Sequence, residues 1–371
     1  MSLRKQEKPF RRHRQNRHPS RASKSGLPPG SLVLVGERKT DTARLGLMAY
    51  GPDLLEESVF ENIAESRNYS HDSADHPVLW LNVHGLHQPE ILSEIGQRFK
   101  LHPLVLEDIL NTDQRPKVDD YGDYLYIVTR FFEYDPETLC VSSEQLSLVL
   151  GHGFVLTFQE RPTGNFNPIR ERIRLNRGQI RRQQADYLAY ALLDVVVDRY
   201  FTILEQIGER TEQLEDDLMQ KATPAVLQTL HQLKRETLTL RRAVWPLREV
   251  VSQLARSDTH FFQPATLPYL RDVYDHTVHV IESLEAIRDL IAGMLDIYLS
   301  SVSNRLNQEV RALTVVAIIF MPSTLISGVF GMNFHSMPLL ENPGGFYLAL
   351  GFMATIAISL GLVFWRRRWL G

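Results

Sequence analysis

Two long runs without a charged residue near the C-terminus constrain this sequence more than any other feature. Residues Ala312–Leu340 and Asn342–Trp365 contain no Asp, Glu, Lys or Arg. Within these runs, residues 312–330 and 346–365 are apolar stretches of 19 and 20 residues. A helix needs about 20 residues to span the hydrocarbon core of a bilayer. We therefore expect a multi-pass membrane protein, although the overall mean hydropathy of −0.20 is typical of a soluble one.

Basic residues flank both apolar stretches on one side. Arg305 and Arg311 precede the first stretch, and three arginines (366–368) follow the second, whereas residues 331–345 between them contain no Lys or Arg. Cytoplasmic loops carry the excess of basic residues in membrane proteins. We therefore expect both termini in the cytoplasm, the connection outside, and an inner or plasma membrane location.

The N-terminal tail has the opposite charge to the rest of the chain. Residues 1–25 contain nine Lys or Arg and one acid, a charge of +8, so the remainder must carry −11 to reach the net charge of −3. Without an apolar run the tail is not a secretory signal. We interpret it as a disordered, solubilising tail, with contact to anionic lipid or nucleic acid as the alternative. The acidic remainder argues against nucleic acid as the main partner and is compatible with cations.

Residues 26–165 have the pattern of a cytosolic α/β domain. Extended runs at 43–50, 78–84, 124–134, 145–150 and 154–158 predict strands, and residues 150–154 predict a hairpin with a glycine-rich turn. Between them, residues 89–99 and 103–110 predict helices, with Pro103 in a first turn. The single cysteine, Cys140, excludes an internal disulfide and favours a reducing compartment.

The chain from residue 166 onward is predicted to be mostly helical. Residues 166–265 predict an antiparallel helical hairpin whose acidic end is either a solvated face or a surface that attracts hydrated cations. Residues 266–311 predict a stalk helix that continues into the first membrane span. An apolar stripe from Val273 to Leu313 repeats along it mostly at steps of three and four, so we expect this helix to pack against copies of itself.

The domain organisation then continues with a first span at 312–331, an external loop at 332–345, a second span at 346–365 and a basic cytosolic end at 366–371. The first span contains polar and small residues that an anchor does not require: Thr314, Pro322, Ser323, Thr324, Ser327 and Gly328. Such residues either line a water-filled path or pack helices together. The second span has fewer of them, so the first is expected around the axis of an oligomer.

The sequence contains no constellation typical of an enzyme. The motifs GxxxxGK[ST], GxGxxG, GxSxG, HExxH and CxxC are absent. The pair His276 and His279 on the stalk is expected to be solvated rather than metal-binding. We therefore predict no enzymatic activity and no organic cofactor.

The tripeptide Gly331-Met332-Asn333 stands at the outer end of the first span, followed by Phe334 and Met337-Pro338. In this position it resembles the signature of the CorA magnesium transporter family. The resemblance covers about residues 40–371 and extends through the segments 102–108, 114–117, 268–276 and 298–304 and the pair Met321-Pro322. It implies a homopentameric funnel: an α/β cytosolic domain, an acidic helical hairpin and stalk helices that line a pore.

The resemblance also implies the roles of particular residues. Gly331, Met332 and Asn333 would form the ion selectivity site, where a neutral Asn carbonyl contacts a hydrated ion, since Mg²⁺ gives up its waters reluctantly. Five positions would line the pore: Asn307, Val310, Leu313, Met321 and Thr324. Four acids would bind regulatory Mg²⁺ between subunits: Glu107, Asp108, Asp272 and, as a weaker candidate, Asp194.

The expected function is channel-like uptake of Mg²⁺, together with Co²⁺ and Ni²⁺, driven by membrane potential and closed by cytosolic Mg²⁺. The partners are further copies of the chain, the lipid bilayer and divalent cations. Two alternatives remain open: the zinc-transporting branch of the same family, and a membrane-anchored cytosolic sensor. Residues 334–338 look more like the magnesium branch. The acid expected directly after Met337-Pro338 is displaced to Glu341.

Overall fold

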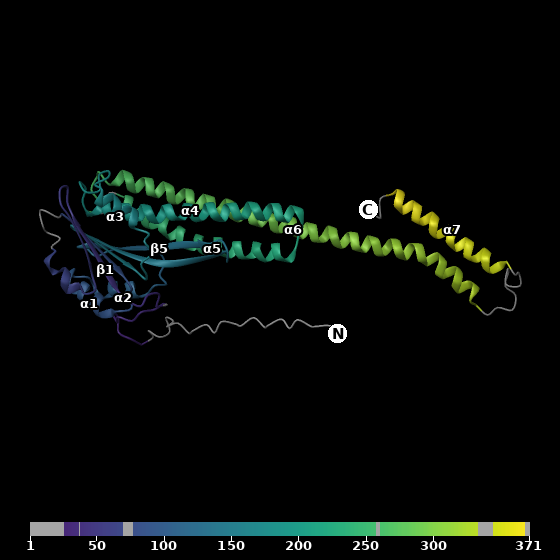
Figure 1. Cartoon of the computed structure of the whole chain (residues 1–371), viewed down its shortest axis with the longest axis horizontal. Helices are drawn as coiled ribbons and strands as arrows, with labels where there is room; N and C mark the ends of the chain where they lie inside the picture. Colours follow the sequence, from purple (N-terminus) through teal and green to yellow (C-terminus); the bar gives the residue numbers. More distant parts are fainter. Residues whose placement is uncertain (1–25, 37, 70–76, 257–259, 333–343, 368–371) are drawn as a thin grey trace, which may run out of the picture. The chain divides into compact units, whose positions relative to one another are not determined.

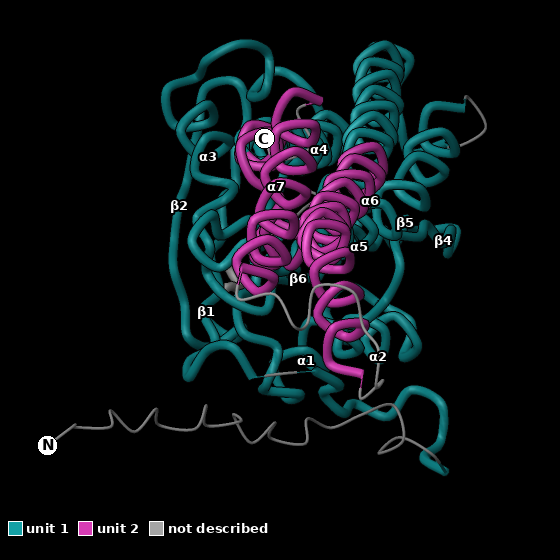
Figure 2. Tube along the Cα trace, turned by 90° about the vertical axis from the view of Figure 1, so that its right-hand side faces the viewer, with its two compact units in different colours: residues 1–213, 229–291 teal, residues 214–228, 292–371 magenta. Residues whose placement is uncertain are grey.

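The computed structural model describes residues 26–36, 38–69, 77–256, 260–332 and 344–367. The chain divides into two compact units (Figure 2). The first comprises residues 1–213 and 229–291, and the second comprises residues 214–228 and 292–371. The N-terminal tail, Asn333 and most of the expected external loop lie outside the described residues.

A seven-stranded sheet forms the centre of the first unit (Figure 1). The strand order is β2-β1-β3-β7-β6-β5-β4, and every neighbouring pair is antiparallel except β3 and β7. A parallel pair requires a long crossover connection, which two helices and three strands supply here. The strands are β1 (Arg44–Tyr50), β2 (Leu55–Phe60), β3 (Val78–His84), β4 (Lys117–Asp120), β5 (Tyr124–Asp135), β6 (Cys140–Gly151) and β7 (Phe154–Gln159).

One face of this sheet packs against helices α1 (Pro89–Arg98) and α2 (Pro103–Leu110). Alternate residues of a strand point to the same face. Leu47 of β1 and Leu81 of β3 are therefore buried together with Ile95 of α1 and Ile109 of α2. These two helices cover the hydrophobic face that the alternating pattern creates.

Helix α2 begins where the sequence predicts. Pro103 occupies its first turn, where the missing N–H has no intrahelical partner to lose. The side chain of His102 caps the helix, accepting a hydrogen bond from the Leu104 N–H at Nδ1 over 3.2 Å. The cap is itself held in place by strand β5, because the His102 N–H donates to the Tyr124 hydroxyl over 2.8 Å.

Helices α3 (Asn167–Arg174) and α4 (Ala185–Gln220) cover the opposite face of the sheet. Phe166, which precedes α3, packs its ring against Trp80 of β3 and Phe131 of β5, with centroids 5.9 and 5.3 Å apart. Tyr200 of α4 donates a hydrogen bond from its hydroxyl to the Arg130 carbonyl over 2.5 Å. The sheet is thus enclosed between two helical layers.

Helices α4 and α5 (Pro224–Ala255) form the expected antiparallel hairpin, and α6 (Leu267–Phe330) runs beside them in the first unit (Figure 1). The Asp186 carboxylate joins the starts of α4 and α6: it accepts hydrogen bonds from the Gln263 N–H (2.9 Å) and the Thr266 hydroxyl (2.6 Å). Arg241 of α5 forms an ion pair with Glu285 of α6 over 2.9 Å. The helices are therefore fixed to one another by polar as well as apolar contacts.

The apolar stripe of α6 is buried at its beginning and exposed near its end. Val273 and Ile291 are at most 1% exposed, whereas Leu306, Val310 and Leu313 are 56–71% exposed. The expectation that the whole stripe packs against copies of itself is therefore wrong for its first part, because α4 and α5 of the same chain cover that part. An exposed apolar surface remains from Leu306 onward.

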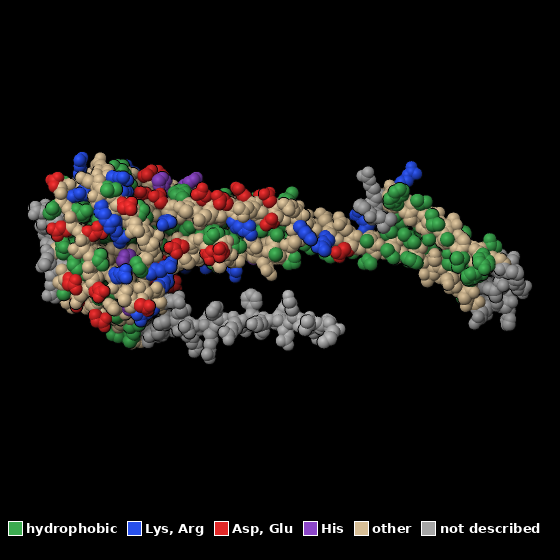
Figure 3. All heavy atoms as spheres, viewed as in Figure 1, with side chains coloured by type: hydrophobic (Ala, Val, Ile, Leu, Met, Phe, Trp, Pro, Cys, Tyr) green, Lys and Arg blue, Asp and Glu red, His purple; other side chains and the backbone are tan. Residues whose placement is uncertain are grey.

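Two helices are long and apolar enough to cross a membrane. These are α6 and α7 (Gly345–Arg366), each with a mean hydropathy of 2.1 in its most apolar window. The buried share of these windows is 6% and 0%, unlike the core helix of a soluble protein. Figure 3 shows hydrophobic side chains along α7 and the last turns of α6, while acidic and basic side chains gather on the first unit.

The sequence pattern predicts most strands and helices, and misses β2, β4, α3 and the short 3₁₀ helix Ile63–Asn68. Strands β1, β3, β5 and β7 match their predicted ranges to within one residue, and β6 begins five residues earlier than predicted. The predicted hairpin is present, with Gly151 paired to Phe154 and Gly153 at a φ of 77°. Edge strands β2 and β4 and helix α3 are missed because charged residues interrupt their apolar pattern.

Phe166→Ala should destabilise the first unit by about 3–5 kcal/mol, because it leaves a cavity between Trp80 and Phe131. Urea unfolding of the full chain in detergent, followed by tryptophan fluorescence, measures this change. Leu175→Ala is the control: that side chain is 56% exposed, so its removal should change the free energy of unfolding by less than about 0.5 kcal/mol. Equal effects of the two substitutions would contradict the assignment of Phe166 to the core.

Candidate functional site

The candidate pore residues lie on one face of the second part of α6, where the stalk continues into the membrane span. At 100° per residue, the directions of Asn307, Val310, Leu313, Met321 and Thr324 fall within about 120° around the helix axis. All five side chains are exposed in the single chain. The face contains no charged residue from position 312 onward. We call these five residues the pore face.

The polar groups of this face are arranged to leave oxygen atoms available. Thr324 donates its hydroxyl hydrogen to the Phe320 carbonyl over 3.0 Å, and Thr314 donates to the Val310 carbonyl over 2.8 Å. The threonine oxygens thus keep lone pairs while their hydrogens are satisfied inside the helix. Pro322 lies within α6 and lacks an N–H, so the helix also loses a backbone hydrogen bond at this level.

The end of α6 is tightly turned around Gly331. The Gly331 N–H donates to the Ser327 carbonyl (2.9 Å), and the Met332 N–H donates to the Val329 carbonyl (3.2 Å). A Cβ added at Gly331 would lie 3.2 Å from the Ser327 oxygen, closer than most side-chain contacts allow. The third residue of the signature, Asn333, lies outside the described residues.

An open hollow follows the pore face toward this end. It has a volume of about 770 Å³ and is lined only by α6 and Met332, including Met321, Thr324 and Gly328. Because no other described element lines the hollow, it provides a surface on which a second copy can pack or along which water and ions can pass.

A second candidate site combines acidic residues of α4 with a histidine of α6. One ligand atom each from Asp194, Asp198 and His276 lies within 4.8 Å of the others. The Asp272 carboxylate lies 3.9 Å from Nε2 of His276. We call these four residues the acidic cluster. Carboxylates bind Mg²⁺, and an imidazole nitrogen also suits Co²⁺ and Ni²⁺.

The electrostatics of the acidic cluster favour a cation. Burial, and secondarily the neighbouring Asp198 carboxylate, raise the pKa of Asp194 to about 6. Groups of the same chain therefore do not fully balance the negative charge of the ionised Asp194 carboxylate. A divalent ion beside it would supply that compensation and lower the pKa again.

The structure does not bring all four predicted regulatory acids together within one chain. Asp194 and Asp272 both belong to the acidic cluster. Asp108 instead forms an ion pair with Lys117 over 2.7 Å, and Glu107 accepts a hydrogen bond from the Gly30 N–H over 2.6 Å. These two acids meet the cluster only if a neighbouring subunit presents them.

Sequence reasoning missed Asp198 and interpreted His276 as solvated. His276 is half-buried, with its ring against Phe201, whereas His279 is mostly exposed. The available signal was the spacing: Asp194 and Asp198, like Asp272 and His276, are four residues apart and share a helix face. Only the packing of α4 against α6 shows that the two pairs meet.

Comparisons with known proteins identify the family of this chain. The sequence profile of the family described as CorA-like Mg²⁺ transporter protein matches residues 75–368. The cobalt/magnesium transport protein CorA of Thermotoga maritima is 42% identical over 349 residues, which cover 94% of this chain and 98% of the relative. The divalent cation transporter CmaX of Pseudomonas aeruginosa is 25% identical and covers 76% of this chain and 85% of its own length.

The fold is also that of a solved transporter. The structure of the CorA magnesium transporter from Methanocaldococcus jannaschii matches 88% of this chain and 98% of its own chain, with a TM-score of 0.74 and 21% identity. Members of this family are ion transporters, not enzymes. The sequence resemblance is therefore confirmed, and the chain belongs to the CorA-like Mg²⁺ transporter family.

Proposed function

We propose that this protein is a channel-like transporter that takes up Mg²⁺, and also Co²⁺ and Ni²⁺, through a pore lined by α6. The observation that carries this proposal is the pore face, a stripe of neutral polar and apolar side chains, exposed in the single chain, on a helix long enough to span a bilayer. The polar side chains of this stripe that lie within the span would face hydrocarbon in a monomer, which is costly. Assembly around an axis turns the stripe toward water.

The ion enters this pore with its hydration shell. A ring of Asn333 side-chain carbonyls, with the backbone carbonyls of Gly331, contacts the bound waters without replacing them, because Mg²⁺ dehydrates reluctantly. Met332 completes the selectivity segment. A cation of charge two gains about 4.6 kcal/mol on entering a cell at −100 mV, so the membrane potential supplies the driving force.

Apolar side chains of the pore face form the barrier in the closed state. Val310, Leu313 and Met321 are exposed and uncharged, and rings of such residues exclude water from a narrow pore. Asn307 and Thr324 provide polar contacts on either side of these residues. Opening then requires only that the apolar rings move apart far enough to be wetted.

The expected topology fits this arrangement. Arg305, Arg311 and Arg366 lie at the same side of the two spans, which by the positive-inside rule is the cytoplasm. Both termini and the first unit are then cytoplasmic, in the inner or plasma membrane. The acidic cluster consequently meets the cytosolic Mg²⁺ that enters through the pore.

The acidic cluster is the regulatory site of this proposal. Within one chain it contains Asp194, Asp198, Asp272 and His276, and a neighbouring subunit contributes Glu107 and Asp108. Carboxylates from two subunits repel one another until a divalent ion lies between them. Bound Mg²⁺ therefore holds the subunits in the closed arrangement, which is negative feedback if the closed state binds the ion more tightly than the open state.

Asn333→Ala should abolish Mg²⁺ uptake by purified protein in proteoliposomes while leaving the oligomer intact, because the ring of neutral oxygens is lost. The flux of Mg²⁺, Co²⁺ and Zn²⁺ through the unchanged protein, measured with fluorescent indicators, identifies the preferred ion. Asn342→Ala, a second asparagine of the same connection, is the control and should retain flux. Normal Mg²⁺ flux in the Asn333 variant would contradict the selectivity assignment. Absence of flux of every cation through the unchanged protein would favour the sensor alternative.

The protein should be a symmetric homo-oligomer, with five copies expected. The exposed apolar surface of α6 from Leu306 onward has no partner among the described residues of its own chain, and a second copy covers it. Light scattering in mild detergent measures the mass of the protein without the detergent. Leu306→Glu should shift the mass toward the monomer, whereas Leu175→Glu, at an equally exposed leucine outside α6, is the matched control. A conducting monomer would overturn the pore proposal.

Millimolar Mg²⁺ should protect the chain from protease, and Asp194→Asn should raise the half-protecting concentration about tenfold because it removes a ligand. Glu209→Gln, an exposed acid of the same helix, should leave the concentration unchanged. For the unsubstituted protein, the half-protecting Mg²⁺ concentration should rise as the pH falls from 7 to 5.5. Protons then compete with Mg²⁺ for Asp194, whose pKa is about 6. Asp272→Lys should reduce the need for Mg²⁺ by supplying positive charge. Equal protease sensitivity with and without Mg²⁺ would show that the cluster does not regulate.

A further inference from the structure

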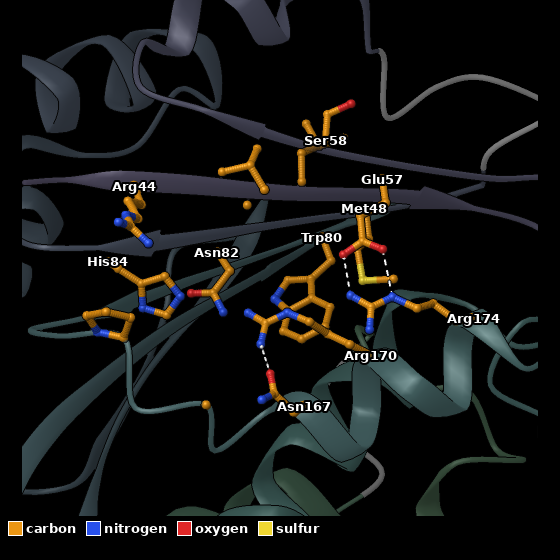
Figure 4. A pocket seen from close by; sticks show the side chains of 15 residues that line it. Arg44, Met48, Glu57, Ser58, Trp80, Asn82, His84, Asn167, Arg170 and Arg174 are labelled. Carbon is orange, nitrogen blue, oxygen red and sulfur yellow. Dashed lines mark hydrogen bonds and ion pairs between the residues drawn. The ribbon is translucent and has the colours of Figure 1, made fainter.

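A pocket of about 300 Å³ lies on the α3 side of the sheet and shares no residue with the pore face or the acidic cluster. Strands β1, β2 and β3 form its floor, and α3 forms one wall (Figure 4). Its lining contains Arg44, Asn82, His84, Trp80 and Arg170. We call it the arginine pocket.

Asn82 is the first sign that this pocket has a ligand. Its side chain is 2% exposed, yet neither Oδ1 nor Nδ2 has a hydrogen-bond partner in the described chain. A buried amide whose donor and acceptor both lack partners destabilises the folded chain. Figure 4 shows the amide directed into the pocket between His84 and Trp80. A molecule with both an acceptor and a donor would satisfy it.

The positive charge of the pocket is only partly neutralised. Arg174 is paired with Glu57 through two hydrogen bonds of 2.6 and 2.7 Å. Arg44 and Arg170 form no ion pair with any described residue. Arg170 donates to the Asn167 side chain over 3.0 Å, and its guanidinium lies 5.2 Å above the Trp80 ring centre. Two guanidinium charges therefore remain available on either side of Asn82.

His84 adds a neutral acceptor. Burial, together with the nearby Arg170 and Arg44 charges, lowers the pKa of His84 to about 4, and the ring hydrogen-bonds to the backbone of Arg161. Nδ1 has no partner in the described chain, so the neutral ring presents a lone pair there. The pocket thus accepts a hydroxyl hydrogen beside the site where it binds negative charge.

The space beside Asn82 exists because its neighbour on β1 is a glycine. Gly46 pairs with Asn82 in the sheet register, so any side chain at position 46 would lie beside the amide. A Cβ added there would meet no atom closer than 3.9 Å. The backbone therefore tolerates a larger residue, and the glycine leaves room for a bound molecule.

We propose that the arginine pocket binds a small oxyanion of about two negative charges that also carries a hydroxyl group. Arg44 and Arg170 pair with the anionic oxygens, and the Asn82 Nδ2 donates to one of them. The hydroxyl group donates its single hydrogen to Nδ1 of His84 or to Oδ1 of Asn82. A phosphate monoester and a hydroxylated polycarboxylate share this chemistry.

Calorimetric titration of the full chain in detergent tests the proposal. The buffer is freed of divalent cations by ion exchange, so that binding of magnesium by the probe does not contribute. The probes are ribose 5-phosphate, citrate and inorganic phosphate, with uncharged ribose for comparison. We expect saturable binding of ribose 5-phosphate or citrate, weaker binding of inorganic phosphate, which is smaller, and none of ribose. Tighter binding of ribose 5-phosphate would indicate a phosphate monoester as the ligand, and tighter binding of citrate would indicate a hydroxylated polycarboxylate.

Two substitutions locate the binding. Gly46→Val fills the space beside Asn82, and Arg170→Met removes one charge while retaining an unbranched stem over Trp80. Each should weaken binding at least tenfold, with an unchanged unfolding temperature in the absence of probe. Arg177→Met, an exposed arginine just after α3, is the matched control and should bind as before. No binding of any probe, unchanged binding in both variants, or an equal loss in the control would overturn the proposal.

Discussion

The continuity of α6 is the constraint on which the rest of this molecule depends. A chain that enters a bilayer must satisfy every backbone N–H and C=O internally, and a single helix does so without any partner. The same helix begins among the buried residues of the first unit, where Asp186 holds its first turn, and its second part contains the pore face. Burial of its first turns thus positions a segment that makes few contacts with its own chain.

The apolar pattern predicts those parts of the fold that depend on hydrophobic burial. Both membrane spans, the hairpin α4–α5 and the strands that alternate into the core follow from the positions of apolar residues alone. Strand β2 does not, because Glu56 and Glu57 interrupt its pattern and only its pairing with β1 makes it a strand. Helix α3 is similar: Ile169 and Ile173 are its only buried residues, too few to indicate a helix in the sequence.

The candidate sites divide in the same way. The five residues of the pore face were assigned by the family resemblance, and the structure adds that they are exposed on one face of a single helix. The acidic cluster required the packing of α4 on α6, and nothing in the spacing of Asp194 and Asp272 along the chain indicates that they meet. The same holds for the arginine pocket, whose central residue, Asn82, is a polar residue within an otherwise hydrophobic strand. A buried amide is recognised as unsatisfied only when its surroundings are known.

The two edges of the sheet have a consequence for any assembly of copies. Open edges of neighbouring sheets pair readily when they are held close together, and the result is aggregation rather than an ordered complex. Here β2 presents two adjacent glutamates, and β4 is four residues long with Lys117, Asp119 and Asp120 among them. Edge strands of this kind repel their equivalents in other copies. The sheets of neighbouring chains can therefore lie close together around a common axis without pairing edge to edge. Contacts between the chains can then be made by helices.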